Sequence, residues 1–377
     1  TYRSSSSLGQ TGNTQTVYDA SKTAIAADTA VFQALAGMTT DATINAAIKT
    51  MSPSTAGAAA ASAAISGSSV NTANTRMAYL RQTGLGKGMN AGGAAKDESM
   101  WLQIFGASID QDTVSSVSGY DADGQGIAIG IDGMSADGTT RIGIAGSFAN
   151  TDVDGKDSTT KTTEDIDTTQ VMVYANKDYA DGMYLQGVAS YSFNDNTGTR
   201  RILVGAVDRT ASSNYDSGLF SIDVEAGWPK EDDGVTITPT VGLTFSHLSA
   251  DTYTETGAGN MNLVVSPTDV NTVEGKVGVK MTGKTVNADG GIGRPEVRVG
   301  VSHNFGDDTA DSTSTFNAGG ASFTTTGVET DSTKVDVGLG YTYTTPEGDT
   351  EISVNVDGRH SSSYVQYGSG LTVKWKF

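Results

Sequence analysis

The chain has 377 residues, of which 24 are Lys or Arg and 43 are Asp or Glu, so its formal charge is −19. This balance opposes nucleic-acid binding, because a protein that neutralises phosphates needs clustered Lys and Arg. The chain has no cysteine, which excludes disulfides, thiolate catalysis and cysteine metal sites and is typical of secreted or envelope proteins.

The first 96 residues are predicted to hold a flexible tail followed by helix. Residues 1–40 begin with a run rich in Ser, Thr and Gly, and we expect this part to be a flexible tail. Residues 41–96 place apolar side chains at helical spacing, as at Ile44, Ala47 and Ile48, and we expect an α-helical linker there. Helical spacing also occurs earlier, at Ile25, Phe32 and Leu35, so the alternative over residues 17–82 is a small helical domain, although its side chains are too small to bury much core.

Two membrane-targeting signals are absent from the sequence. No apolar run reaches the length of about 18 residues that a transmembrane helix needs, so none is predicted. No signal peptide begins at Thr1, and we expect the chain to be part of a longer precursor.

From residue 97 to residue 377 the apolar period becomes two, which indicates strands. In residues 235–245, Val, Ile, Pro, Leu and Phe fill the odd positions, and Thr and Gly fill the even ones. The polar faces carry charges on strand after strand, among them Asp223, Glu225 and Glu274. Twelve such segments are predicted, at 99–109, 126–132, 142–148, 168–177, 183–193, 220–228, 235–245, 273–281, 297–305, 334–343, 352–357 and 364–377.

The number and length of these strands predict an all-β fold, a twelve-stranded antiparallel transmembrane barrel. An even number of strands closes such a barrel, and several segments are long enough to cross a membrane at a tilt. Short turns such as Asp137-Gly138 and Glu347-Gly348 alternate with long polar connections at 150–166, 249–270 and 305–330. A soluble β-sandwich would also alternate, but the strand length and the aromatic C-terminus favour the barrel.

The last fourteen residues form a strongly amphipathic strand. One face is apolar and ends on an aromatic residue, whereas the opposite face carries two lysines that we expect in or near the lumen. A terminal aromatic row suits a strand that closes an outer-membrane barrel and ends in its interfacial girdle. The apolar face includes Leu371, Val373, Trp375 and Phe377.

Several short motifs resemble the translocator domain of monomeric autotransporters, the type Va secretion proteins, over roughly residues 40 to 377. Residues 101–106 (WLQIFG) look like the first strand of that domain, and residues 119–132 look like the second arm of its first hairpin. The segments EAGW at 225–228, PEVR at 295–298 and WKF at 375–377 complete the set.

The resemblance implies a barrel whose N-terminal helix threads the lumen, with residues 1–40 proximal to a passenger that is exported to, or anchored at, the bacterial surface. It further implies a monomeric barrel in outer-membrane lipid and insertion by the barrel-assembly machinery. The recognition signal for that machinery would be Leu371, Val373, Trp375 and Phe377. An outer-membrane diffusion porin is the alternative function, and conductance would distinguish the two.

The helix before the barrel is similar to the linker helix of the family, which commonly carries two arginines spaced like Arg76 and Arg81. We expect both to anchor the helix in the pore, because a confined charge needs partners. Candidate luminal partners are Asp223, Glu225 and Glu274. The alternative is that both arginines are solvated, since exposed ion pairs contribute under roughly 1 kcal/mol.

One subgroup of the family cuts its own linker at an Asn-Asn bond inside the barrel. Alignment on Arg76-Met77 places the attacking residue at Asn71, but Thr72 follows it, so the pair is incomplete. Asn is also an ordinary residue of helix surfaces and caps. Self-cleavage at Asn71 therefore stands as an alternative to an uncut linker.

The sequence offers no other chemistry. His247, His303 and His360 lie on separate strands or rims without metal-ligand spacing. Residues 86–91 match a dinucleotide fingerprint only loosely and follow a helix, and residues 121–126 are better explained as a turn than as a calcium loop. We predict no metal, no cofactor and no enzymatic activity apart from the Asn71 alternative.

Overall fold

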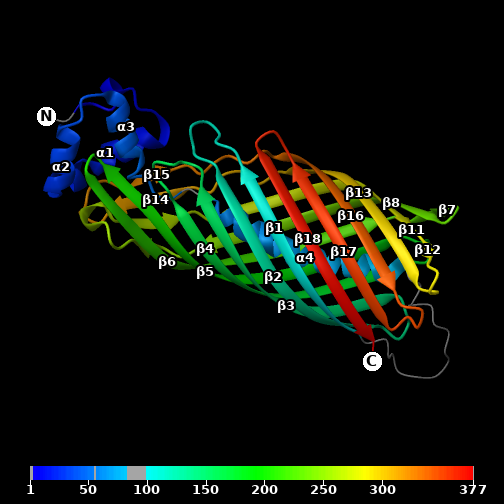
Figure 1. Ribbon diagram of the computed structural model, residues 1–377. Coiled ribbons are helices and arrows are strands. Elements are labelled where there is room, and N and C mark those ends of the chain that lie inside the picture. The colour runs from blue at the N-terminus through cyan, green and yellow to red at the C-terminus, as the bar shows by residue number, and fades with distance from the viewer. Residues whose placement is uncertain (1–2, 55–56, 83–98, 377) are drawn as a thin grey trace.

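The computed structural model describes residues 3–54, 57–82 and 99–376. Among them, twelve long strands close into a barrel, with helices at one end and inside it (Figure 1). Neighbouring strands pair antiparallel, and the last strand pairs with the first over their whole length, so the predicted barrel is confirmed. Its strands are β1 (Ser99–Gln111), β2 (Tyr120–Met134), β3 (Thr140–Gly155), β4 (Thr163–Asp178), β5 (Tyr184–Val204), β6 (Val207–Gly227), β8 (Val235–Ala250), β11 (Val270–Gly283), β13 (Ile292–Asn304), β16 (Thr333–Thr344), β17 (Thr350–His360) and β18 (Tyr364–Lys376).

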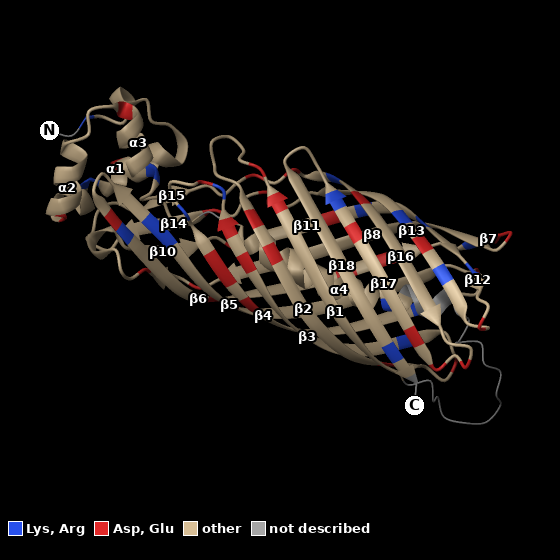
Figure 2. Cartoon of the chain, in the orientation of Figure 1, with Lys and Arg blue, Asp and Glu red and all other residues tan. Residues whose placement is uncertain are grey.

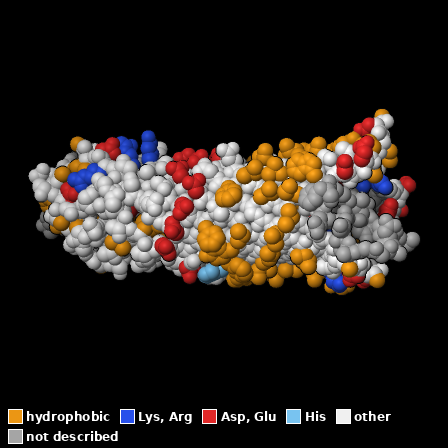
Figure 3. Space-filling model, turned by 90° about the horizontal axis from the view of Figure 1, so that it is seen from below, with side chains coloured by type: hydrophobic (Ala, Val, Ile, Leu, Met, Phe, Trp, Pro, Cys, Tyr) orange, Lys and Arg blue, Asp and Glu red, His pale blue; other side chains and the backbone are white. Residues whose placement is uncertain are grey.

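The barrel wall is apolar outside and polar or closely packed inside. On β4, Val171 and Val173 are 54% and 55% exposed, whereas the intervening Met172 and the preceding Gln170 are buried. Because successive side chains of a strand point to opposite faces, the alternation in the sequence becomes an apolar belt around the barrel. Figure 3 shows this belt over the middle of the molecule. A belt of this kind is what a membrane-spanning barrel presents to lipid.

The two ends of the barrel differ in the length of their connections. At the end that holds the C-terminus, the predicted turns at Asp137-Gly138 and Glu347-Gly348 are present, and both glycines adopt positive φ. Two hairpins there are extended by β7 (Lys230–Asp232) and β12 (Thr285–Val286). Since short turns face the periplasm and long loops face outward in outer-membrane barrels, the other end is extracellular.

The long extracellular loops contain structure of their own. The segments β9 (Tyr253–Thr254), β10 (Leu263–Pro267), β14 (Ser312–Phe316) and β15 (Phe323–Thr325) form a four-stranded sheet. The short helix η2 (Gly259–Met261) connects β9 to β10. The hairpin of β5 and β6 projects to the same level and ends where Val204 pairs with Val207. These loops therefore provide an apolar platform beyond the membrane.

Residues 3–51, which we call the helical module, pack on this platform (Figure 1). The module contains η1 (Ser6–Leu8), α1 (Gly12–Ala27), α2 (Thr29–Ala36) and α3 (Asp41–Lys49). Val17, Ile25 and Val31 are fully buried. The expectation of a flexible tail over residues 1–40 is therefore wrong for the part the structure describes, because the barrel loops supply the core that the short helices lack. The boundary expected at residue 41 also moves, since α3 belongs to the module.

Helix α4 (Ala58–Gln82) runs along the inside of the barrel, as predicted for the linker (Figure 1). Its start packs beside Tyr120 at the extracellular end of β2, and Arg76 near its end reaches Ser99 at the periplasmic start of β1. The remainder of the expected linker, residues 83–96, lies outside the described residues. Among the described residues, no helix combines the length and apolarity that crossing a membrane requires.

Candidate functional site in the barrel lumen

Helix α4 packs against the wall formed by β1 to β5 through small side chains. The hydroxyls of Ser66 and Ser69 hydrogen-bond those of Ser192 and Ser147, each at 2.9 Å. A Cβ atom built at Gly124 of β2 would lie 2.9 Å from Cδ1 of Ile65, so glycine lets the helix approach this strand. The Ala, Ser and Gly side chains of α4 are too small to build a core of their own, but they allow the helix to lie close to the barrel wall.

Near the periplasmic end of the lumen, Arg76 is buried in a cluster of charges. Its Nε and Nη2 atoms lie 2.9 and 3.1 Å from the two carboxylate oxygens of Asp132, and Nη2 donates to Ser99 Oγ at 2.6 Å. Its Nη1 atom lies 3.5 Å from Glu351 Oε2. All three charged side chains are at most 4% exposed. A two-pronged arginine–carboxylate contact fixes orientation as well as position, so it sets both the depth and the rotation of α4.

The barrel wall completes this cluster with two more cations. Arg141 Nη1 lies 2.6 Å from Asp132 Oδ1, and Lys374 Nζ lies 2.7 Å from Glu351 Oε1. Tyr174 donates its hydroxyl to Asp132 at 3.1 Å. Lys374 thus faces the lumen as predicted. Because the contributing strands include β1, β2, β17 and β18, Arg76 ties the helix to both sides of the seam where the barrel closes.

The acids predicted as arginine partners contact other groups. Asp223 accepts from Asn74 Nδ2 of α4 at 2.8 Å, so it does hold the helix, but not through an arginine. Glu225 and Glu274 pair with cations of the wall, Lys280 at 2.5 Å and Arg359 at 3.1 Å respectively. For Arg76 the predicted partners are therefore wrong. The alternation along a strand predicts which acids face the lumen, but it does not predict which side of the lumen the helix occupies.

The remaining predicted site residues of the linker are only partly described. Asn71 donates its Nδ2 atom to Asp357 Oδ2 at 3.2 Å. The side chain of Arg81 lies outside the described residues. Of the two arginines predicted as anchors, Arg76 is therefore the one whose contacts with the wall are described.

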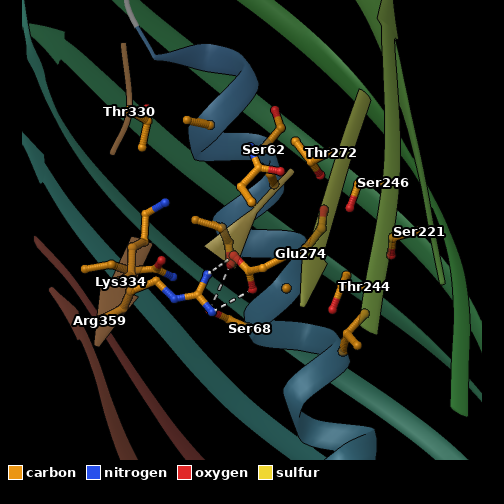
Figure 4. Close-up of a pocket in the computed structure, with 18 of the residues that line it drawn as sticks. Ser62, Ser68, Ser221, Thr244, Ser246, Thr272, Glu274, Thr330, Lys334 and Arg359 are labelled. Carbon is orange, nitrogen blue, oxygen red and sulfur yellow. Dashed lines mark hydrogen bonds and ion pairs between the residues drawn. The ribbon is translucent and has the colours of Figure 1, made fainter. Parts of the chain in front are cut away.

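The opposite face of α4 borders a cavity of about 590 Å³ that reaches the wall of β6, β8, β11, β13 and β16. Figure 4 shows Ser62 and Ser68 of the helix together with Glu274, Arg359 and Lys334 of the wall, all of which line this cavity or border it. Arg359 contacts Glu274 through both terminal nitrogens, at 3.2 and 3.1 Å. The cavity is thus lined by many hydroxyl side chains and crossed by paired charges, which suits a path for a hydrated chain. In the described part of the chain, no group of three or more acidic, His or Cys residues is placed to hold a metal ion.

Comparison with known proteins decides what this lumen belongs to. The autotransporter beta-domain family matches residues 100–357. The chain belongs to the autotransporter family. Similar proteins include Outer membrane protein A of Rickettsia conorii, 25% identical over 284 residues that make up 74% of this chain and 14% of that protein. Outer membrane protein B of Rickettsia prowazekii is 25% identical over 284 residues, 74% of this chain and 17% of that protein. This autotransporter chain therefore spans less than a fifth of these relatives.

Solved structures show the same fold. The translocator domain of autotransporter NalP from Neisseria meningitidis superposes with a TM-score of 0.61 at 16% identity, over 83% of this chain and 98% of that one. The beta domain of the Bordetella autotransporter BrkA gives a TM-score of 0.56 at 14% identity, over 75% of this chain and 100% of that one. The autotransporter barrel described here is an outer-membrane translocator. A diffusion porin is not favoured, since α4 occupies much of the lumen.

The last strand of the autotransporter barrel presents its predicted apolar row outward. Leu371 and Trp375 are 44% and 41% exposed on the lipid-facing side, and Val373 lies on the same face between them. Phe377 lies outside the described residues. The outward row is therefore available from the membrane side of the closing strand.

Sequence reasoning missed Asp132 and Glu351, the acids that hold Arg76. Both lie at the periplasmic ends of their strands, Asp132 two residues before the end of β2 and Glu351 at the second residue of β17. A signal was present, because Asp132 has the same parity as the inward-facing Ala128 and Gly130. Finding the pair also required knowing that β17 and β2 both lie beside the seam.

Proposed function

We propose that this barrel exports an N-terminal passenger to the cell surface and keeps it anchored there. The observation that carries the proposal is the path of α4, which starts at Ala58 among the extracellular loops and approaches Ser99 at the periplasmic end. Any segment N-terminal to α4 then lies outside the cell. No catalytic residue is needed, because the polar lumen passes the chain and Arg76 holds the last segment in place.

An epitope inserted at two positions tests this direction. An epitope before Thr1 should be accessible to antibody on intact cells, because it lies on the extracellular side of α4. The same epitope inserted after Gly138, in a short periplasmic turn, should be accessible only after the outer membrane is opened. An N-terminal epitope that stays hidden, while one inserted after Gly319 in an extracellular loop is accessible, would contradict export.

We further propose that the barrel-assembly machinery inserts this barrel as a monomer and recognises its closing strand. Support comes from one chain closing the barrel alone and from the outward row of Leu371, Val373 and Trp375, which Phe377 continues in the sequence. Deleting Phe377 should strongly reduce the amount of folded barrel in outer membranes, measured by heat-modifiable mobility. Phe377→Tyr is the control, because it retains an aromatic end and should insert normally. Normal insertion of the protein that lacks Phe377 would count against a recognition signal in the closing strand.

Self-cleavage at Asn71 is a second candidate function, supported by its contact with Asp357 at 3.2 Å. In this reaction the Asn71 side-chain nitrogen attacks its own backbone carbonyl carbon while Asp357 accepts a proton. The bond to Thr72 breaks, Thr72 leaves as a new amine after taking up a proton, and a cyclic imide remains at residue 71. Mass measurement of the folded protein tests it: a mass split at this bond, abolished by Asn71→Ala, supports cleavage, and a single intact mass rejects it.

A further inference from the structure

The core of the extracellular end is shared between two parts of the chain that are far apart in sequence. It contains eleven buried side chains from residues 8–51 and nine from the barrel hairpins and loops between residues 202 and 323. Ile48 and Met51 of the module are fully buried, as are Ile202 and Met261 of the barrel side. Helices of eight and nine residues, such as α2 and α3, are too short to be stable without such packing. Each part therefore completes the core of the other.

Charged contacts fix α2 and α3 at the same interface. Arg209 Nη1 of β6 lies 2.5 Å from Asp28 Oδ2, and Asp28 in turn caps α2 by accepting from Val31 N at 3.2 Å. The hydrogen bond from Arg209 holds the pKa of the Asp28 carboxyl below its ordinary value. Arg200 pairs with Glu255 and donates Nη1 to the carbonyl oxygen of Thr50, just after α3, at 2.9 Å.

Uncharged contacts fix both ends of α1. Asn13 near its start exchanges two hydrogen bonds with the backbone of Thr326, at 2.8 and 3.0 Å. Asn260 donates to the carbonyl oxygen of Ala27, its last residue, at 2.9 Å. All three helices of the module are therefore bonded to the barrel at an end, by residues that lie 150 or more positions away in the sequence.

We propose that the extracellular loops of the barrel are a binding site for the chain's own helical module, which holds this module and whatever precedes it on the barrel without help from the covalent linker. The covalent connection is the short segment between α3 and α4, and it contributes a high effective concentration only while it is intact. A cut in the linker then leaves a two-part complex at the cell surface. This retention goes beyond export and makes anchoring independent of α4.

The test uses the full chain, folded in detergent, with a protease recognition sequence flanked by Gly and Ser inserted after Ser54. After complete cutting, confirmed on a denaturing gel, the module fragment should elute with the barrel in size-exclusion chromatography. Asp28→Ala combined with Arg209→Ala should speed its release at least tenfold in a dilution chase. Arg201→Ala is the matched control, because Arg201 pairs with Asp208 of its own hairpin at 2.6 Å and should leave release unchanged.

A second variant guards against a general folding defect. Ile48→Asp places a charge in the shared core and should release the fragment immediately, while the barrel keeps its heat-modifiable mobility. Immediate release of the unmodified fragment after cutting would overturn the proposal, as would equal release from the Asp28/Arg209 variant and the Arg201 control. Because the assay uses purified protein, a failure of export in cells cannot produce either outcome.

Discussion

At the scale of single residues, Arg76 is the side chain on which the position of α4 depends most. Arg76→Ala removes one partner from each of two buried carboxylates, although Asp132 keeps Arg141 and Glu351 keeps Lys374. We expect a loss of about 3 kcal/mol in the free energy of unfolding, the lower end of the range for breaking a buried pair. Urea unfolding in detergent, followed by tryptophan fluorescence, measures it.

Arg76→Lys separates charge from geometry in the same experiment. Lysine keeps the positive charge but cannot make the two-pronged contact with Asp132. Arg76→Lys should therefore lower the free energy of unfolding, but by less than Arg76→Ala does. A lysine variant as unstable as the alanine variant would show that the fork geometry matters more than the charge. An alanine variant as stable as the unchanged protein would show that Arg76 does not anchor the helix.

Asp331, in the extracellular loop before β16, gives a pH dependence at the residue scale. It accepts hydrogen bonds from the hydroxyls of Ser362 and Ser363, at 2.7 and 2.8 Å, and from the backbone N–H of Ser363 at 2.9 Å. These bonds, the one from Ser362 first, lower the pKa of Asp331 below its ordinary value. The folded state therefore binds this proton more weakly than the unfolded state.

The sign of the effect follows from that difference. The stability that Asp331 contributes is complete above the ordinary pKa of aspartate, about 4, and is lost as the pH falls toward the lower folded value. Asp331→Asn should cost about 1 kcal/mol at pH 7, since solvent screens the partly exposed carboxylate, and should flatten the stability curve below pH 4. An unchanged slope between pH 4 and pH 2 would contradict the assignment.

At the scale of strands, the outer wall carries acidic residues directly opposite one another. Just outside the apolar belt, Asp123 faces Asp152 across β2 and β3, and Asp152 faces Asp165 across β3 and β4. Figure 3 shows acidic side chains between the belt and the helical module, and Figure 2 shows acids on the strands at this level. Like charges at directly opposed positions destabilise a sheet.

Asp165→Asn should therefore stabilise the barrel. The repulsion between Asp152 and Asp165 exists only while both carboxylates are ionised, so it is absent well below the ordinary aspartate pKa of about 4. The variant should gain roughly 0.3 kcal/mol at pH 7 and nothing at pH 3. Asp208→Asn is the contrasting control, since Arg201 lowers the pKa of Asp208 and its loss should destabilise. A gain that persists at pH 3 would rule out charge repulsion as the cause.

The same scale shows what the sequence could predict. The alternation of apolar and polar side chains in residues 235–245 and 364–375 predicts strands, because one face of a barrel strand contacts lipid and the other faces the lumen. The packing of the helices at 12–27 and 29–36 on the barrel was not predicted, since their core partners, such as Phe316 and Met261, lie in loops hundreds of residues later. Likewise, the lumen parity of Glu225 could be predicted, but its pairing with Lys280 depends on which wall α4 covers.

At the scale of the whole molecule, two parts of the chain lie on the route through the barrel: α4 in the lumen and the helical module at its extracellular end. Arg76 ties α4 to the seam at the periplasmic end, Asp223 holds it through Asn74 farther along, and the module packs on the loops beyond. If α4 is the seal, a chain that begins at residue 57 should conduct as little current in a planar bilayer as the full chain. A chain that begins at residue 83 should conduct several-fold more, because a helix that fills much of the lumen is gone.

Each truncation must first show heat-modifiable mobility, so that only closed barrels are compared. Equal conductance of the full chain and the chain from residue 83 would mean that the wall alone closes the pore, against the role given to α4. High conductance of the chain from residue 57 would instead make the helical module the seal. In that case the anchoring cluster at Arg76 would serve to position the helix without closing the pore, and Arg76→Ala in the full chain would lower stability while leaving conductance unchanged.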